Sequence, residues 1–317
     1  MASQTRIYFA TDLHGSSKCF RKFVNAGAAY GVDVLVLGGD IAGKALQTIV
    51  RGPGDRYRCS FVGTDYDVEV GPDLEALEKL IADHGYYPYR AEAGELDARR
   101  ADGSLDGLFV ELMRQRLIEW LNLADERLRP AGRRLFFMLG NDDPIELRTL
   151  LDEAPWGVHG EGRVVMLDDD HEMISLGYSN VTPWHSHREM TEDQLATAID
   201  EMAGRLGSPE RAIMNVHVPP FGSGLDDAPV LDANLVVQTA IGQVKFTPVG
   251  STAVRDALVR VQPLLGLHGH IHESGGMRRL GRTIAINPGS DYGTGVLNGA
   301  LITLGRDKVL AHQLVRG

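Results

Sequence analysis

Five short apolar runs along the chain each end in a motif that carries glycine or polar side chains. They cover residues 7–10, 34–37, 135–139, 213–216 and 264–267. Runs of this length, rich in β-branched and aromatic residues, are typical of strands buried on both faces of a layered sheet. In an open α/β sheet, ligands bind in the crevice outside the carboxyl ends of the strands. We therefore expect residues far apart in the sequence to meet at these strand ends.

Helical spacing of apolar residues follows the first run. Phe20, Phe23 and Val24 form a stripe that predicts a helix over residues 18–30, with Ser17 as its N-cap and Gly31 at its end. Further helices are predicted over residues 73–83, 105–127 and 252–261, and further strands over residues 164–167, 173–176, 283–286, 300–304 and 309–314. The mixture indicates an α/β protein.

Two pairs of residues mark the starts of other helices. Thr191 and Gln194 have the spacing of a capping box, in which each side chain binds the backbone of the other. Asp143 followed by Pro144 predicts an N-cap and a first-turn proline, opening a short helix that reaches about residue 152. This interpretation gives Asp143 a structural role.

Residues 44–130 interrupt the alternation of strands and helices. They contain the turn at residues 52–54, a predicted hairpin of residues 56–61 with 66–70, and two of the predicted helices. A stretch of this kind between two site-bearing strands is typical of an insertion at the mouth of a binding site. We expect one domain over residues 1–317 with an insertion at about 44–130.

Length and charge narrow the class of protein. With 317 residues, of which 43% are hydrophobic, the chain can bury a large core. The net charge of -11 argues against binding of duplex nucleic acid or of an anionic membrane, because both need clustered Lys and Arg. Cys19 and Cys59 are expected to be reduced thiols. Without a predicted signal peptide or an apolar span of ~20 residues, we expect a cytoplasmic protein.

The motifs at the run ends supply oxygen and imidazole groups but no thiolate. Residues two apart on an extended segment project to the same side, so Asp12 with His14, and His270 with His272, can each present two ligands. Asp40 stands alone at its strand end and is suited to bridge two ions. This donor set favours Mn, Fe or Zn over Mg and Ca, which prefer oxygen ligands alone.

The charge of such a site indicates its substrate. Two divalent ions bring about +4, and two carboxylates return about -2, so the pocket stays positive and attracts phosphate. Two metals about 3.5–4 Å apart lower the pKa of a bridging water and stabilise charge on phosphoryl oxygens. The residues thus favour a metal-dependent phosphoester hydrolase.

Five motifs, in this order, resemble those of the calcineurin-like metallophosphoesterase superfamily. They are Asp12-x-His14, Gly39-Asp40, Gly140-Asn141-Asp142-Asp143, His217-Val218-Pro219-Pro220 and Gly269-His270-Ile271-His272. The resemblance implies a four-layer αββα sandwich with two facing mixed β-sheets. It also implies one ion held by Asp12, His14, Asp40 and His272, and a second held by Asp40, Asn141, His217 and His270. Residues 217–226 and 269–274 resemble a bacterial and archaeal subgroup related to cyclic-AMP phosphodiesterases.

The residue after Asn141 departs from the superfamily pattern. Many members carry a histidine there, which is thought to protonate the leaving group or to bind phosphate, whereas this chain has Asp142. Either Asp142 acts as the acid, with a pKa raised by burial, or metal-bound water and a good leaving group make an acid dispensable. Asp142, Asn141 and His217 are the candidate catalytic residues.

The other histidines have weaker patterns. His268 is expected to point into the sheet interior or to pair with the backbone, with a role in substrate binding as the alternative. His185 and His187 lie in a loop where solvated side chains and substrate contacts both fit the pattern. The remaining histidines show no partner pattern and are expected at the surface: His84, His159, His171 and His312.

The sequence thus favours a phosphodiesterase that uses a metal-bridging hydroxide as nucleophile, acting on a small, nucleotide-like phosphoester. The alternatives are a phosphomonoesterase or a nuclease of the same fold, or an inactive scaffold that keeps the fold without turnover. All seven expected metal ligands are present, which argues against the scaffold. A homo-oligomer is compatible with the sequence, and the insertion could form its contact.

Overall fold

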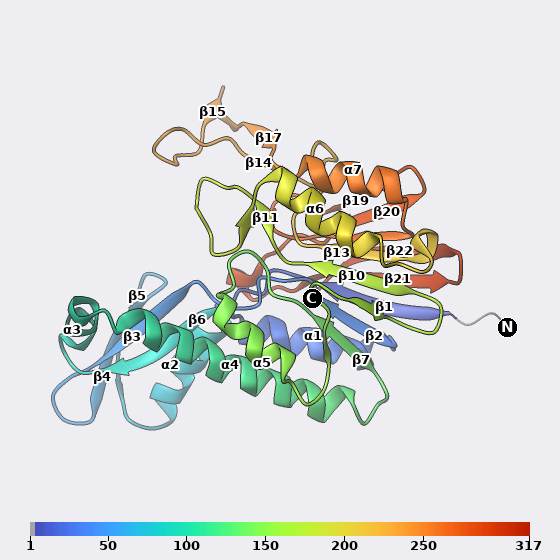
Figure 1. Ribbon diagram of the computed structural model, residues 1–317. Coiled ribbons are helices and arrows are strands. Elements are labelled where there is room, and N and C mark those ends of the chain that lie inside the picture. Colours follow the sequence, from blue (N-terminus) through green and yellow to red (C-terminus); the bar gives the residue numbers. More distant parts are fainter. Residues whose placement is uncertain (1–3) are drawn as a thin grey trace.

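Two six-stranded sheets face each other at the centre of the computed structural model, which describes residues 4–317 (Figure 1). β1 pairs parallel with β2, β2 with β7 and β7 with β8, while β21 pairs antiparallel with both β1 and β22. In spatial order the first sheet contains β22 (Lys308–Arg316), β21 (Asn298–Gly305), β1 (Thr5–Ala10), β2 (Val34–Leu37), β7 (Arg134–Phe137) and β8 (Val158–His159).

The second sheet is also mixed. Its four inner strands are parallel, and the strand at each edge is antiparallel to its neighbour. In spatial order it contains β19 (Gly276–Leu280), β20 (Thr283–Asn287), β18 (Leu265–Leu267), β13 (Ile213–Val216), β10 (Glu172–Leu176) and β9 (Val164–Met166).

Both faces of each sheet are covered, which explains why the strands read as continuous apolar runs. Ile7 and Phe9 of β1 pack between the sheets, in one cluster with Ile213 of β13. Tyr8 and Ala10, which alternate with them, pack on the opposite face against the helices. The strand pattern therefore follows from a position between two apolar layers.

Helices form the two outer layers (Figure 1). α1 (Ser17–Ala29), α4 (Leu105–Leu128) and α5 (Arg148–Asp152) cover the first sheet, where Phe20 of α1 stacks on Trp120 of α4 at 4.2 Å between ring centroids. α6 (Glu192–Ala203) and α7 (Thr252–Val261) cover the second sheet. None of the helices within residues 4–317 is long and apolar enough to cross a membrane.

The observed helix starts agree in part with those predicted from the sequence. Thr191 and Gln194 form the predicted capping box of α6, and α7 covers the predicted residues. The N-cap of α1 is Ser16 rather than Ser17, because Ser16 is extended and its Oγ accepts a hydrogen bond from the backbone N of Cys19 at 3.3 Å. Cys19 and Cys59 are buried free thiols, as expected.

Two histidines expected at the surface are buried instead. His159 lies with its Nδ1 2.9 Å from Asp152, and His171 lies with its Nδ1 2.8 Å from Asp168. Each imidazole has a carboxylate partner within seven residues of the chain. Pairing lowers the cost of burying a polar ring, so the surface prediction for these two residues is wrong.

The predicted insertion forms a separate sheet, and the chain then continues into α4, one of the helices that cover the first sheet. The insertion lobe, residues 45–102, contains β3 (Ala45–Arg51), β4 (Arg56–Phe61), β5 (Thr64–Glu69), β6 (Tyr86–Ala91), α2 (Pro72–Asp83) and α3 (Glu95–Asp102). It has a small core of its own, which includes Ile49, Phe61 and Leu74. The β4–β5 hairpin was predicted, whereas β3 and β6 were not. α4 leaves the lobe and packs on α1.

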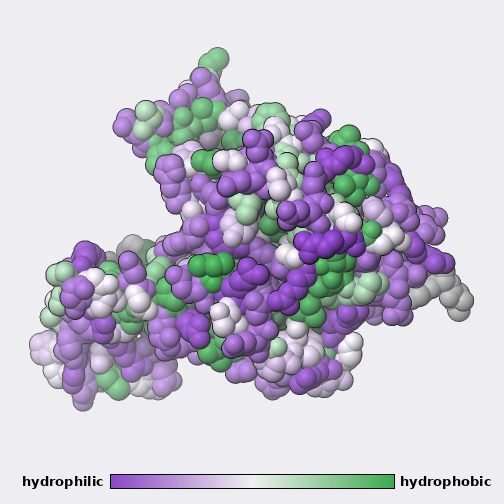
Figure 2. All heavy atoms as spheres, viewed as in Figure 1, coloured by the Kyte–Doolittle hydropathy of each residue, from purple (hydrophilic) through white to green (hydrophobic). Residues whose placement is uncertain are grey.

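A second projection lies opposite the insertion lobe. The β14–β17 arm, residues 227–248, is built from β14 (Asp227–Pro229), β15 (Thr239–Ala240), β16 (Gln243–Val244) and β17 (Phe246–Pro248). Figure 2 shows a hollow in the surface between the arm and the insertion lobe. Shorter elements complete the fold: β11 (Ser179–Asn180), β12 (Glu189–Met190), and the 3-10 helices η1 (Ile145–Leu147), η2 (Pro209–Arg211) and η3 (Tyr292–Thr294).

Three glycines join the insertion lobe to the loop after β1. A Cβ atom on Gly43 would lie 2.1 Å from the carbonyl oxygen of Gly85, and one on Gly85 would lie 2.4 Å from that of His14. Gly15 belongs to the same contact, because its Cβ would lie 2.8 Å from Gly85. Arg116 of α4 donates to the carbonyl oxygen of Gly15 at 2.7 Å. The backbones touch here, so no larger residue fits.

We expect Gly43→Ala to lower the free energy of unfolding by about 1–3 kcal/mol, because the new methyl group forces two backbone segments apart. Gly107→Ala is the matched control. Nothing lies within 4 Å of its Cβ position in α4, so we expect a gain of about 0.5–1 kcal/mol. Urea unfolding followed by circular dichroism measures both changes. Wild-type stability of Gly43→Ala would contradict the close contact.

Candidate metal centre

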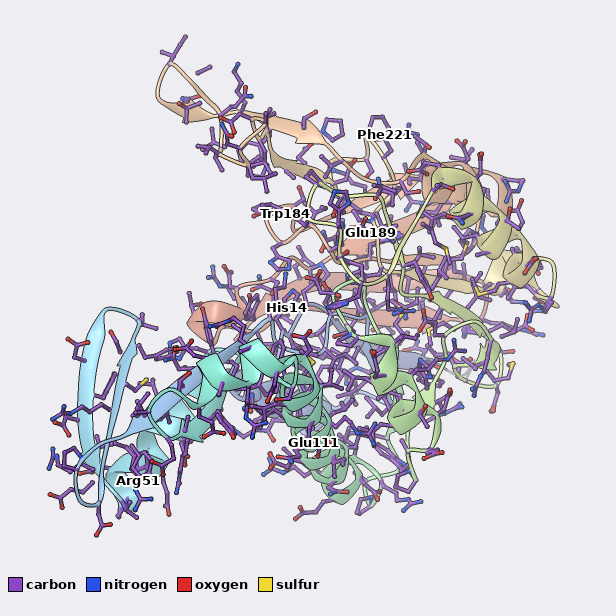
Figure 3. The ribbon with its side chains drawn as sticks, turned by 60° about the vertical axis from the view of Figure 1, so that its left-hand side comes forward. His14, Arg51, Glu111, Trp184, Glu189 and Phe221 are labelled. Atoms are coloured by element: carbon purple, nitrogen blue, oxygen red, sulfur yellow. The ribbon has the colours of Figure 1, made fainter. Side chains whose placement is uncertain are left out.

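The seven candidate ligands come from the carboxyl ends of five parallel strands, three in one sheet and two in the other. Asp12 and His14 follow β1, Asp40 follows β2 and Asn141 follows β7 in the first sheet. The second sheet contributes His217 after β13, and His270 and His272 after β18. Figure 3 shows His14 below the gap that separates the two projections. The structure brings all these strand ends to one place.

One group of side chains consists of Asp12, His14 and His272, whose potential ligand atoms all lie within 4.8 Å of one another. The Nε2 atoms of His14 and His272 are 3.1 Å apart, and His272 Nε2 lies 3.5 Å from Asp12 Oδ1. The backbone N of His270 donates to the Asp12 carboxylate at 3.1 Å, which fixes its orientation. Three ligand atoms thus converge on one small volume.

The second group consists of Asp40, His217 and His270, which meet within the same limit of 4.8 Å. Asp40 Oδ2 lies 3.4 Å from His217 Nε2 and 3.6 Å from His14 Nε2. The Asp40 carboxylate therefore stands between the two groups. The bridging role predicted for Asp40 from the sequence is compatible with this placement and stays a prediction.

Four of these residues have an unusual backbone conformation. Asp12, His14, Asp40 and His270 have φ values of 55°, 40°, 48° and 67°. Non-glycine residues in this left-handed region cost about 1–3 kcal/mol each and are found mainly at functional sites. This backbone conformation turns each side chain toward the place where the strand ends meet. The packing around the site has to compensate for the strain.

Several buried ligand atoms have no partner among residues 4–317. The Nδ1 of His217 lies 2.8 Å from the carbonyl oxygen of Gly38 and must donate to it, because a carbonyl only accepts. His217 Nε2 therefore faces the cluster, where that atom has no hydrogen-bond partner, and it offers a lone pair to a cation that displaces its proton. Asn141 Oδ1 is likewise buried and unpartnered. These donor atoms fit borderline divalent cations.

The pKa values of the clustered side chains are also compatible with a bound cation. Burial would raise the pKa of Asp12, but attraction to His217 and a hydrogen bond with His272 hold it at about 2. Burial would lower the pKa of His217, but the carboxylates of Asp40 and Asp12 raise it to about 10. Burial lowers the pKa of His270 to about 4. The two carboxylates thus hold a positive charge among them, and a metal ion can take that place.

Asp142 lies at the rim of the cluster. Its backbone N donates to Asp40 Oδ1 at 3.0 Å, and its Oδ2 lies 2.5 Å from Lys44 Nζ. Burial and the charge of Asp40 raise the pKa of Asp142 despite the pairing with Lys44. Asp142 also forms a third convergent group with His14 and Asp40. Lys44, which begins the insertion, brings an ammonium group to this rim.

Asp143 does not cap a helix, so that prediction is wrong. Pro144 is extended, and η1 starts after it without a side-chain cap. The buried Asp143 carboxylate instead accepts three backbone hydrogen bonds, from Gly140 at 2.7 Å, Ala42 at 2.7 Å and Ile41 at 3.0 Å. It therefore holds the loop after β7 against the loop after β2. Burial, with the charge of Asp40, raises its pKa to about 7.

The three histidines considered for substrate binding have different environments. His268 is fully buried, and its Nδ1 lies 2.8 Å from the carbonyl oxygen of Val216, so it pairs with the backbone. His185 and His187 are both exposed, and His185 has a φ of 50°. Both lie in the loop between β11 and β12.

No role was predicted from the sequence for Ser186 and Arg188, two residues of this loop that contact Asn141. The Nδ2 of Asn141 donates to Ser186 Oγ at 2.8 Å, and the backbone N of Arg188 donates to the carbonyl oxygen of Asn141 at 3.0 Å. Arg188 also reaches the carbonyl oxygen of Gly140 and pairs with the buried Glu161. Their only signal in the sequence is a position between His185 and the predicted helix.

Comparisons with known proteins bear on the fold. No family model and no curated protein matches the sequence. One crystal structure is similar over 99% of this chain and 99% of its own, with 16% identity and a TM-score of 0.56. The crystal structure of TT1561 of Thermus thermophilus is similar over 99% of both chains, with 13% identity and a TM-score of 0.53.

A dimetal phosphatase from Danio rerio is also similar, over 96% of this chain and 98% of its own, with 10% identity and a TM-score of 0.44. Identities of this size concern the fold and not the activity. The expected α/β class and the two facing mixed sheets agree with the two structures whose TM-scores are 0.56 and 0.53. These similarities show the fold alone, and the resemblance to the calcineurin-like metallophosphoesterase superfamily rests on the five motifs.

Proposed function

We propose that this chain is a metal-dependent hydrolase of phosphoesters that prefers phosphodiesters. The observation that carries the proposal is a pair of buried ligand groups with the Asp40 carboxylate between them. One divalent ion would be held by Asp12, His14, Asp40 and His272, and the other by Asp40, Asn141, His217 and His270. The donor atoms favour Mn, Fe or Zn.

Two such ions would activate a water molecule as the nucleophile and stabilise the charge that builds on phosphoryl oxygens. The residues of the chain hold the ions and orient the substrate beside them. Asp12 and Asp40 together bring about -2, so a pocket with two divalent ions stays positive and attracts a phosphate ester. Figure 2 shows the surface hollow that would admit this substrate.

Lys44 and Asp142 are the rim residues suited to the leaving-group side. The Lys44 side chain is 49% exposed and lies against Asp142. Its ammonium group can bind a phosphoryl oxygen or the oxygen of the leaving group while it stays paired with the Asp142 carboxylate. Asp142 would protonate the leaving group, or a good leaving group would depart without an acid. The pairing with Lys44 opposes protonation of Asp142, which favours the second option for activated esters.

A diester suits this rim better than a monoester. A monoester dianion needs further cationic side chains, and Lys44 is the cation that pairs with a residue of the candidate centre. We propose a small, nucleotide-like diester as the substrate class, because the net charge of -11 disfavours a nucleic acid polymer.

Metal binding is the first test. We expect the wild-type chain to bind two Mn ions and to unfold at a higher temperature with excess Mn, since binding to the folded state alone stabilises it. Asp40→Asn should weaken Mn binding more than about tenfold, because it removes the charge shared by both ion sites. Calorimetric titration measures this change. Asp65→Asn, at an exposed hairpin position, is the matched control. Equal affinity in both variants would contradict the assignment.

The substrate class is the second test. A panel of nitrophenyl mono- and diesters, assayed with added Mn, should give a higher kcat/KM for the diesters. A preference for monoesters would reverse the proposed order. Absence of turnover on the whole panel by the Mn-loaded protein would argue for a scaffold.

The rim residues give a third test. Asp142→Ala should keep most of its rate on nitrophenyl esters and lose about 10²-fold or more on esters with an unactivated alcohol, if Asp142 is the acid. Lys44→Met should raise KM on both kinds of ester, because it removes a charge that binds phosphate. Full rate of Asp142→Ala on unactivated esters would exclude the acid role.

A further inference from the structure

The loop that connects β11 to β12, residues 181–188, runs beside Asn141. In Figure 3, Trp184 and Glu189 lie above His14, with Trp184 toward the open side. Trp184 is 61% exposed, and its backbone N donates a hydrogen bond to Thr182 Oγ1 at 3.2 Å. Ser186 reaches inward from the same loop to the Asn141 amide at 2.8 Å. The loop thus joins a surface segment to a candidate metal ligand.

Glu189 organises this loop through a single carboxylate oxygen. Its Oε1 accepts hydrogen bonds from Thr182 Oγ1 at 2.5 Å, from the backbone N of Ser186 at 2.8 Å and from Ser186 Oγ at 2.9 Å. An ionised carboxylate only accepts, so the hydroxyl hydrogen of Ser186 must point to Glu189. The serine has no second hydrogen to donate.

The direction of the next hydrogen bond follows. Because its hydrogen is used, Ser186 Oγ must accept from Asn141, and only the amide nitrogen Nδ2 can donate. The same Nδ2 donates to Asp142 Oδ1 at 3.1 Å, which is a second carboxylate acceptor. Two acceptors therefore fix the amide nitrogen on one side. The positions of Nδ2 and Oδ1 therefore follow from the hydrogen-bond partners of the amide and not from its shape, which is nearly the same in both orientations.

The amide oxygen must then point the other way. Asn141 is 3% exposed, and its Oδ1 is buried with no hydrogen-bond partner among residues 4–317. An unpaired buried oxygen is energetically unfavourable, and a ligand on that side would offset this cost. If the amide turned by about 180°, its NH₂ group would take the place of the oxygen and would repel a cation there.

We propose that Ser186 and Glu189 are positioning residues that hold the Asn141 amide so that its oxygen is presented to a divalent cation. This inference rests on the proposed function, because it assumes the ion site that Asn141 shares with Asp40, His217 and His270. The backbone of Asn141 is held separately by Arg188, so the Ser186 contact acts on the side chain.

Calorimetric titration of the full chain with Mn tests the proposal. Ser186→Ala should weaken binding at one of the two ion sites by about 10–100-fold, the usual effect of losing a partner that orients a ligand, and should leave the other site unchanged. Ser186→Thr keeps the hydroxyl and should restore the affinity. Ser208→Ala is the matched control, because Ser208 bonds to Arg211 away from the centre.

A double-mutant cycle isolates the path through Asn141. In an Asn141→Ala background, Ser186→Ala should have no further effect on Mn affinity, because the amide that it orients is gone. An effect of the same size in both backgrounds would overturn the proposal, and so would wild-type affinity of Ser186→Ala alone. Thermal unfolding in a chelator shows that each variant is folded.

The affinity measurements do not depend on turnover. A wild-type chain that binds Mn at two sites but hydrolyses no ester would refute the proposed hydrolase, while the affinities of the Ser186 variants would still support or overturn the positioning role. A wild-type chain that binds no Mn would overturn both.

Discussion

The burial of two carboxylates at adjacent strand ends is the constraint on which the rest of this structure depends. Asp12 and Asp40 are each 1% exposed and lie where two apolar sheets meet. Buried charges of the same sign are tolerated only when positive groups compensate them. Without an ion, His217 takes that role by holding a proton, while His14 and His270 stay neutral. The same arrangement is suited to metal ions because it already requires positive charge.

The surrounding fold keeps this charged group in place. Four left-handed residues direct the ligands inward, at a cost that packing of the sandwich must offset. Asp143 links the loops after β2 and β7 through three backbone hydrogen bonds, so Asp40 and Asn141 move together. Arg188 and Glu161 support the same loop from the side of the second sheet. The ligands are therefore held by both sheets at once.

The sequence predicted features with a local signal and missed those that depend on tertiary contacts. Apolar runs followed by polar motifs indicated the strands and ligands, because burial on both faces is visible in consecutive residues. β3 was missed because its residues are mostly half-buried, and β6 because its buried and exposed residues do not alternate regularly. Asp143 before a proline carries a strong local capping signal, yet it accepts hydrogen bonds from three backbone N–H groups, two of which lie in the distant loop after β2. The contacts of Ser186 likewise join residues 45 positions apart.

The glycine contact between the insertion lobe and the first sheet has a consequence for access to the centre. The backbones at Gly43, Gly85 and His14 touch without side chains between them, and Arg116 ties α4 to the same point. No layer of side chains separates the insertion lobe from the loop that carries His14. A tilt of the lobe would therefore displace His14 itself. One wall of the entrance is therefore continuous with the candidate centre, so the position of the lobe and the placement of His14 depend on each other.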